Sequence, residues 1–254
     1  MSIDRDTDHG AVVEARPWGP WATAGLSVVV AVVYLVTAVV IGVAIVIAEL
    51  AVHPGQDPSR LAESLEQSGL LLATGAIGTA VVCGSLVLLF AWMRRGISVA
   101  QYLGFRPVRA LSLLAWLLGI AAFALATDAL TLGLGKPLVP EFMVVAYETA
   151  GFLPLFWLGI VVAAPAFEEL FFRGFLLEGL HNSRLGAAGA VVLTSGLWAV
   201  VHVQYGSYER GIIFALGILL GIARIQTRSI WTAIAMHAMV NLMATVEAAI
   251  VCGG

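Results

Sequence analysis

Long apolar runs are the feature that most restricts how this chain can fold. Seven stretches of apolar residues are separated by polar loops, at about residues 22–48, 69–93, 110–134, 152–178, 187–203, 211–225 and 229–251. A helix of about 20 apolar residues crosses the roughly 30 Å hydrocarbon core of a bilayer and satisfies its own backbone hydrogen bonds there. We therefore expect an all-α fold, a polytopic membrane helical bundle of about seven (six to eight) transmembrane helices.

Composition excludes several classes of protein. The chain is 60% hydrophobic and only 11% charged, whereas a soluble domain carries roughly a quarter charged residues. The net charge of −3 and the lack of a basic stripe argue against a nucleic-acid partner. The two cysteines, Cys83 and Cys252, are too far apart in sequence to form a metal-binding motif. The lipid bilayer is the first partner that we expect.

The loops indicate how the bundle is oriented. Arg94, Arg95, Arg106 and Arg109 lie between the second and third runs, and such positive loops stay in the cytoplasm. Alternation then places the N-terminus inside and the C-terminus outside, with residues 1–21 as a cytoplasmic polar tail before an uncleaved signal-anchor helix. The loops 53–68 and 135–150 each predict a short surface helix, and the short sixth run predicts a tilted or partly re-entrant span.

Three ionisable groups interrupt the fourth run, in "PAFEELFFRGFLLEGL" (165–180). A charge at mid-bilayer costs about 2.5–3.5 kcal/mol on insertion scales. Glu169 and Arg173 are four residues apart, so on a helix they share a face and can form an ion pair. Glu168 points about 100° away from that pair, which would leave its carboxylate free. The alternative is a helix end at the membrane surface, where water solvates all three groups.

Two later runs carry further polar groups. Trp198 and His202 lie one turn apart in "GLWAVVH" (196–202), as do His237 and Asn241 in "AMHAMVNLM" (235–243). A lone histidine in an apolar helix is usually packed against a neighbour. Here, however, Glu168 and His202 are equally distant from position 185 in the connecting turn, so antiparallel helices bring them to the same depth. We expect the polar groups of the three helices to converge.

These stretches resemble the CPBP family of CAAX proteases and bacteriocin-processing enzymes, also called the ABI or type II CAAX endopeptidase family. The family motifs are EExxxR, an aromatic residue followed by xxxH, and HxxxN, in that order on successive membrane helices. The resemblance covers about residues 152–245. The family more often has phenylalanine where Trp198 stands.

The resemblance implies an intramembrane endopeptidase that hydrolyses peptide bonds of membrane-associated proteins, in CAAX-type or bacteriocin-related processing. Residues 152–251 would then form the catalytic membrane core, and residues 22–151 three additional N-terminal spans. Glu168 would be the general base, His202 would hold the attacking water, and His237 with Asn241 would bind the water or the oxyanion. Glu169 and Arg173 would orient the motif helix, with a part in catalysis also open to Glu169, and Trp198 would have an orienting role.

A metal is the main open point in that scheme. Glu168, His202 and His237 form a plausible zinc set with a water in the fourth position. The usual metalloprotease signature HExxH is absent, and we favour metal-independent hydrolysis with no certain cofactor. The family has been described both as metalloprotease and as glutamate protease.

Two other functions are compatible with the same residues. One is a non-catalytic membrane adaptor or bacteriocin self-immunity protein that keeps the motif for packing. The other is a solute transporter, although no matched pair of broken helices supports transport. For the enzyme we expect a protein or peptide substrate with an apolar membrane-associated segment. One lysine against twelve arginines points to a GC-rich bacterial genome and hence to the bacterial plasma membrane.

Overall fold

The computed structural model describes residues 16–65 and 68–253, and within these ranges it is an all-α membrane bundle without a strand. Most of the expected polar tail, residues 1–15, lies outside the described part. Six helices are long and apolar enough to cross a membrane: α1 (Pro20–Val52), α3 (Gly69–Met93), α5 (Ala110–Gly133), a composite helix (Leu153–His181), α11 (Ser207–Thr227) and α12 (Ile230–Gly253). The apolar α10 (Gly186–Val201) is shorter. The expected fold class is therefore confirmed.

Two polar loops carry the short helices that their sequences predict, α2 (Pro58–Leu65) and α6 (Glu141–Glu148). The loop 94–109 carries a further short helix, α4 (Val99–Leu103), which the sequence analysis did not predict. The sixth apolar run is not partly re-entrant, because α11 is an uninterrupted helix of 21 residues, and its tilt stays a prediction. Its first turn uses polar residues, Ser207 and Glu209, which the apolar pattern alone does not include.

The fourth span is a composite of α and π turns. It consists of α7 (Leu153–Trp157), η1 (Leu158–Ala163), α8 (Ala164–Glu169), η2 (Leu170–Leu176) and α9 (Leu177–His181), of which η1 and η2 are π-helical. π turns hold more residues per turn than α turns and occur frequently at functional sites. The two π segments flank the short α8 that carries the glutamate pair.

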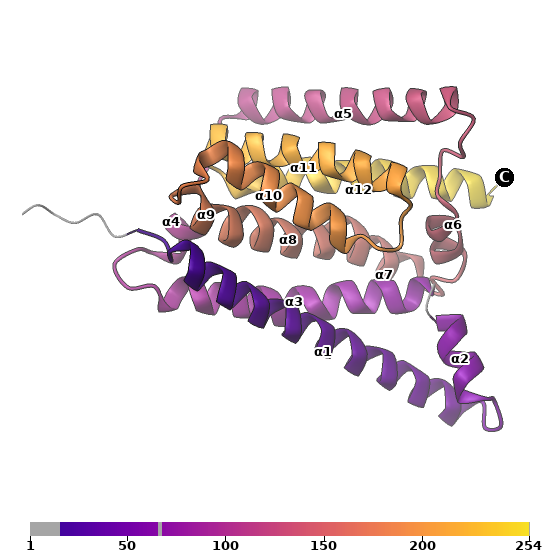
Figure 1. Cartoon of the computed structure of the whole chain (residues 1–254). Coiled ribbons are helices and arrows are strands. Elements are labelled where there is room, and N and C mark those ends of the chain that lie inside the picture. Colours follow the sequence, from indigo (N-terminus) through magenta and orange to yellow (C-terminus); the bar gives the residue numbers. More distant parts are fainter. Residues whose placement is uncertain (1–15, 66–67, 254) are drawn as a thin grey trace, which may run out of the picture.

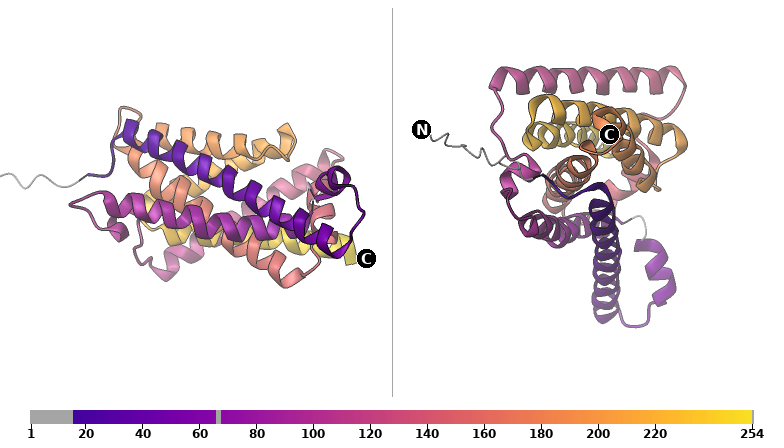
Figure 2. Two further views of the ribbon diagram at one scale, coloured as in Figure 1. Left: turned by 90° about the horizontal axis from the view of Figure 1, so that it is seen from below. Right: turned by 60° about the vertical axis from the view of Figure 1, so that its left-hand side comes forward.

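This composite helix occupies the centre of the bundle. It packs against α3, α10 and α12, while α5 lies at one edge and α1 with α2 at the opposite edge (Figures 1 and 2). Gly159 permits the close contact with α3, since a Cβ there would lie 2.9 Å from the Cα of Ala73. The central position explains how Glu169 and Arg173 are shielded from both water and lipid.

One end of the bundle, which we call the arginine-rich end, contains the loops at residues 94–109 and 182–185 and the turn at Arg228. Arg224 forms an ion pair with Glu178 there, with 3.3 Å between Nη2 and Oε2. Tyr102 in α4 is buried beside them, and burial raises its pKa to about 12. The ion pair joins α9 to α11, and the ring of Tyr102 stacks on that of Phe175 in η2.

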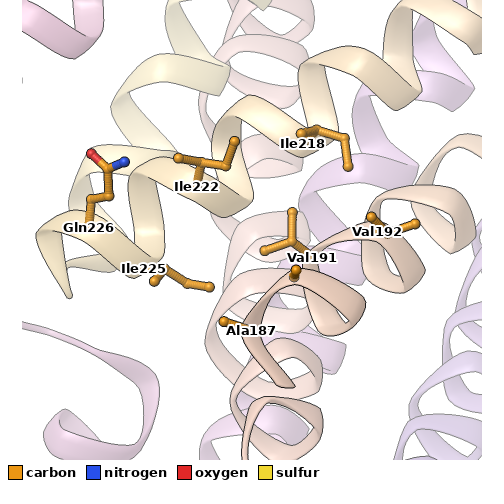
Figure 3. A pocket seen from close by; sticks show the side chains of 8 residues that line it. Ala187, Val191, Val192, Ile218, Ile222, Ile225 and Gln226 are labelled. Carbon is orange, nitrogen blue, oxygen red and sulfur yellow. The ribbon is translucent and has the colours of Figure 1, made fainter. Parts of the chain in front are cut away.

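An apolar groove of about 310 Å³ lies along the contact between α10 and α11, towards the arginine-rich end (Figure 3). It is lined by Ala187, Ala188, Val191, Val192, Ile218, Ile222, Ile225 and Gln226. None of these residues belongs to the polar cluster described next, so the groove is a separate feature.

Candidate active site

Glu169 lies at the centre of a buried ion cluster. Its Oε1 accepts a hydrogen bond from Nη1 of Arg173 at 2.9 Å and lies 2.9 Å from Nδ1 of His237. All three residues are buried. The ion pair that the four-residue spacing predicts is therefore present, and the carboxylate is shared with a histidine from α12.

Several groups hold Arg173 in place. Its Nη2 donates to the carbonyl of Gly217 at 3.3 Å, and its guanidinium lies 4.5 Å from the ring centroid of Trp198. Gly217 must be small, because a Cβ there would lie 2.9 Å from the Cβ of Ser195 and 3.1 Å from Nη2 of Arg173. A carboxylate, a carbonyl and an aromatic face thus compensate for the desolvation of the cation.

Glu168 is not free, contrary to our expectation from the helix geometry. The indole Nε1 of Trp198 donates a hydrogen bond to its Oε2 at 2.6 Å. Glu168 stays half-buried, unlike the fully buried Glu169. The spacing within one helix cannot reveal this contact, because Trp198 lies 30 residues later on α10. A hydrogen bond to a charged carboxylate is stronger than one to a neutral acceptor.

His202 lies just beyond α10, which ends at Val201, and not within the helix as we expected. Its Nδ1 lies 2.7 Å from the carbonyl oxygen of Trp198, one of the last carbonyls of α10. Such carbonyls have no partner within the helix. Because a carbonyl can only accept, Nδ1 must carry the proton, and the Nε2 of a neutral ring is then an acceptor.

α12 presents His237 and Asn241 to the central helix from the same face, as expected. Oε1 of Glu169, which forms the ion pair with Arg173, is the acceptor here too, so Nδ1 of His237 carries a proton and a neutral ring again has Nε2 as an acceptor. Nδ2 of Asn241 donates to the carbonyl of Ile160 in η1 at 2.8 Å. The amide nitrogen of Asn241 is therefore already bound to the backbone of the central helix.

Trp198 is the residue around which the cluster converges. Its ring centroid is 5.1 Å from that of His202 and 5.1 Å from that of His237, both in edge-to-face orientation. Its indole N–H contacts Glu168. The three motifs therefore come together at one point, and His237 bonds to the residue directly after Glu168.

Tyr205 is a residue of the site that the sequence analysis missed. Its ring stacks on that of His202, with centroids 6.2 Å apart. Burial raises the pKa of Tyr205 to about 12, and the nearby carboxylate of Glu168 adds to the rise. The phenol is therefore neutral at physiological pH. The only sequence signal is its position three residues after His202.

The proposed zinc ligands do not form a metal-binding group in the part of the chain that the structure describes. Among those residues, no three His, Cys, Asp or Glu side chains are placed to hold a metal ion. We derive no step through a metal, and metal-independent hydrolysis stays a prediction.

Fold and site together define a class: a polytopic α-helical membrane protein with a buried polar cluster inside the bundle. Residues 150–243 match the family model described as type II CAAX prenyl endopeptidase Rce1-like. The match confirms the family resemblance over the composite helix, α10, α11 and much of α12, and it implies a protease. No curated protein and no solved structure gives a significant match.

Trp198→Phe should separate the role of the indole N–H from that of the ring. The substitution keeps an aromatic face for Arg173 and removes the donor to Glu168. A hydrogen bond to a charged group contributes about 1.5–3 kcal/mol, so we expect kcat of peptide cleavage to fall about 10- to 100-fold with little change in KM. Trp116→Phe on α5 is the matched control. A Trp198→Phe variant with wild-type kcat would show that the N–H has no part in the reaction.

Proposed function

We propose that this protein is an intramembrane endopeptidase that hydrolyses peptide bonds of membrane-associated proteins. The observation that supports this most is the contrast between the two glutamates. Glu169 is fully buried and bound by Arg173 and His237, whereas Glu168 is half-buried and held by one neutral donor. A partly exposed carboxylate, whose tryptophan partner packs against two imidazoles, is suited to general-base chemistry.

In the proposed reaction, Glu168 takes a proton from a water molecule while the water oxygen attacks the scissile carbonyl carbon. His202 accepts the second hydrogen of that water through Nε2, because its Nδ1 is committed to Trp198. The tetrahedral intermediate collapses as the C–N bond breaks, and Glu168 returns its proton to the leaving amine. Water is thereby divided between the new carboxylate and the new amine.

In this proposal His237 stabilises the oxyanion of the tetrahedral intermediate. A protonated His237 would be paired with the carboxylate of Glu169 and would present an Nε2–H donor. Such a donor, fixed before the substrate binds, stabilises an oxyanion without reorganisation. Glu169 and Arg173 then act through His237 by holding its ring.

We propose a division of the chain that is based on where the polar groups of the site lie. The composite helix, α10, α11 and α12 supply every polar group of the site, so residues 152–251 would be the catalytic core. The apolar surface of the bundle implies a substrate with an apolar segment beside the cleaved bond. The alternative adaptor or immunity function has no contact in the structure that favours it.

Proteomics of protein termini tests the function directly in cells. Membranes from cells that make the wild type should contain new N-termini that disappear with Glu168→Ala, and the sequences around them should include an apolar segment. Addition of a chelator to washed membranes should leave this cleavage unchanged. Identical termini in both strains would favour the adaptor, and loss of cleavage on chelation would favour a metalloprotease.

We propose further that the arginine-rich end faces the cytoplasm. Four arginines lie in the loop 94–109, and the translocation machinery retains such loops. A phosphatase reporter fused after Gly253 should be active, since that enzyme requires an oxidising compartment, and one inserted in loop 94–109 should be inactive. The opposite pair of signals would reverse the orientation.

A further inference from the structure

The backbone of the central helix contains a carbonyl that its own helix cannot satisfy. The N–H of Ala164 donates to the carbonyl of Gly159, five residues earlier, as in a π turn. The next carbonyl, that of Ile160, would take the N–H of residue 165 in the same register. Residue 165 is proline, which has no N–H. In an α register the donor would be Ala164, which is already used.

Asn241 supplies the missing donor from another helix. Its Nδ2 lies 2.8 Å from the carbonyl oxygen of Ile160. A bare carbonyl inside a bilayer is unfavourable because water is not there to replace the partner. Asn241 therefore supplies the donor that Pro165 lacks, although the two residues are 76 positions apart in the sequence.

The register of this turn decides where the glutamates point. Each residue of an α-helix turns the chain by about 100°, so a helix that lost the extra residue of the π turn would rotate all later side chains by about that angle. α8, with Glu168 and Glu169, begins directly after η1. Such a rotation would take Glu169 away from His237 and Glu168 away from Trp198.

We propose that Asn241 is a positioning residue that fixes the π register of η1, and thereby the direction of the glutamate pair, through the carbonyl of Ile160. This assigns to Asn241 a role other than binding the water or the oxyanion. The inference rests on the proposed function only where activity is measured, because the hydrogen bond itself can be tested through stability.

A double-mutant cycle with Pro165 separates the two roles of Asn241. Asn241→Ala should lower the melting temperature and should reduce kcat about 5- to 100-fold, the range for leaving one buried carbonyl without a donor. Pro165→Ala gives residue 165 an N–H that can bond to Ile160. In the Pro165→Ala background, we therefore expect Asn241→Ala to lower the melting temperature and kcat much less than it does in the wild type.

Two further variants serve as controls. Pro154→Ala removes a proline from the first turn of the same span, where no N–H is needed. In the Pro154→Ala background, Asn241→Ala should therefore lower the melting temperature and kcat as much as it does in the wild type. Asn241→Asp keeps the shape of the side chain but turns an acceptor toward the carbonyl, and it should melt at least as low as Asn241→Ala.

The outcomes separate the two proposals. If Asn241→Ala lowered kcat equally in the wild-type and Pro165→Ala backgrounds and left the melting temperature unchanged, Asn241 would act on the reaction and the positioning role would be wrong. If the wild type cleaved no peptide, the proposed function would fail. The melting-temperature cycle would still decide whether Asn241 secures Ile160, and equal melting losses in both backgrounds would contradict that.

Discussion

Glu168→Gln is expected to reduce peptide cleavage about 100- to 10,000-fold, the range lost when a general base is removed. Glutamine keeps the size of the side chain and can still accept the hydrogen bond from Trp198, so the melting temperature should hardly change. The rate should be measured with purified protein in liposomes, on a substrate found from the cellular termini.

A matched carboxylate shows whether the effect is specific. Glu247→Gln on α12 also removes an acid from the same membrane bundle, but the residue belongs to no contact of the cluster, and its activity should stay at the wild-type level. Full activity in Glu168→Gln would show that another group activates water, and the roles of the two glutamates would have to be exchanged or abandoned.

Arg173→Ala should give the largest loss of stability. Removing one partner of a buried ion pair leaves an uncompensated charge and costs about 3–5 kcal/mol. For a chain of this size that is about 6–20 °C in melting temperature. Glu169 would retain only His237 as a partner, and its Oε2 already has no hydrogen bond within the described part of the chain.

Neutralising the stranded acid should recover part of this loss. The double variant Glu169→Gln/Arg173→Ala has no buried unpaired charge at this position, so it should melt higher than Arg173→Ala alone in the same detergent. Arg109→Ala, at an exposed position, should change stability by no more than about 0.5 kcal/mol. A melting temperature for Arg173→Ala equal to the wild type would mean that the ion pair does not stabilise the fold.

Most of the fold and the presence of the cluster could be predicted because both follow from periodicity and depth. Long apolar runs define the spans, and the four-residue spacing places Glu169 beside Arg173. The equal distances from position 185 predict that Glu168 and His202 lie at the same depth, and both contact Trp198. Each of these predictions needs only the rise and turn of a regular helix.

The contacts that could not be predicted depend on departures from regular helices or on contacts between them. The π turns change the direction of every side chain after Leu158, and the apolar pattern of the fourth run does not predict them. His202 follows the last residue of α10, and its ring binds the carbonyl of Trp198. The indole of Trp198 reaches Glu168 only because α10 packs against the central helix. An expectation built on one helix at a time therefore left Glu168 without a partner.

The most direct test of the proposed mechanism is single-turnover cleavage by the wild-type protein in ¹⁸O-labelled water. If Glu168 activates water for direct attack, the first product should carry one ¹⁸O in its new C-terminal carboxylate, and Glu168 itself should carry none. A first product without label, with ¹⁸O found in the Glu168 side chain after turnover, would show that the carboxylate attacks the peptide itself and would contradict the general-base mechanism.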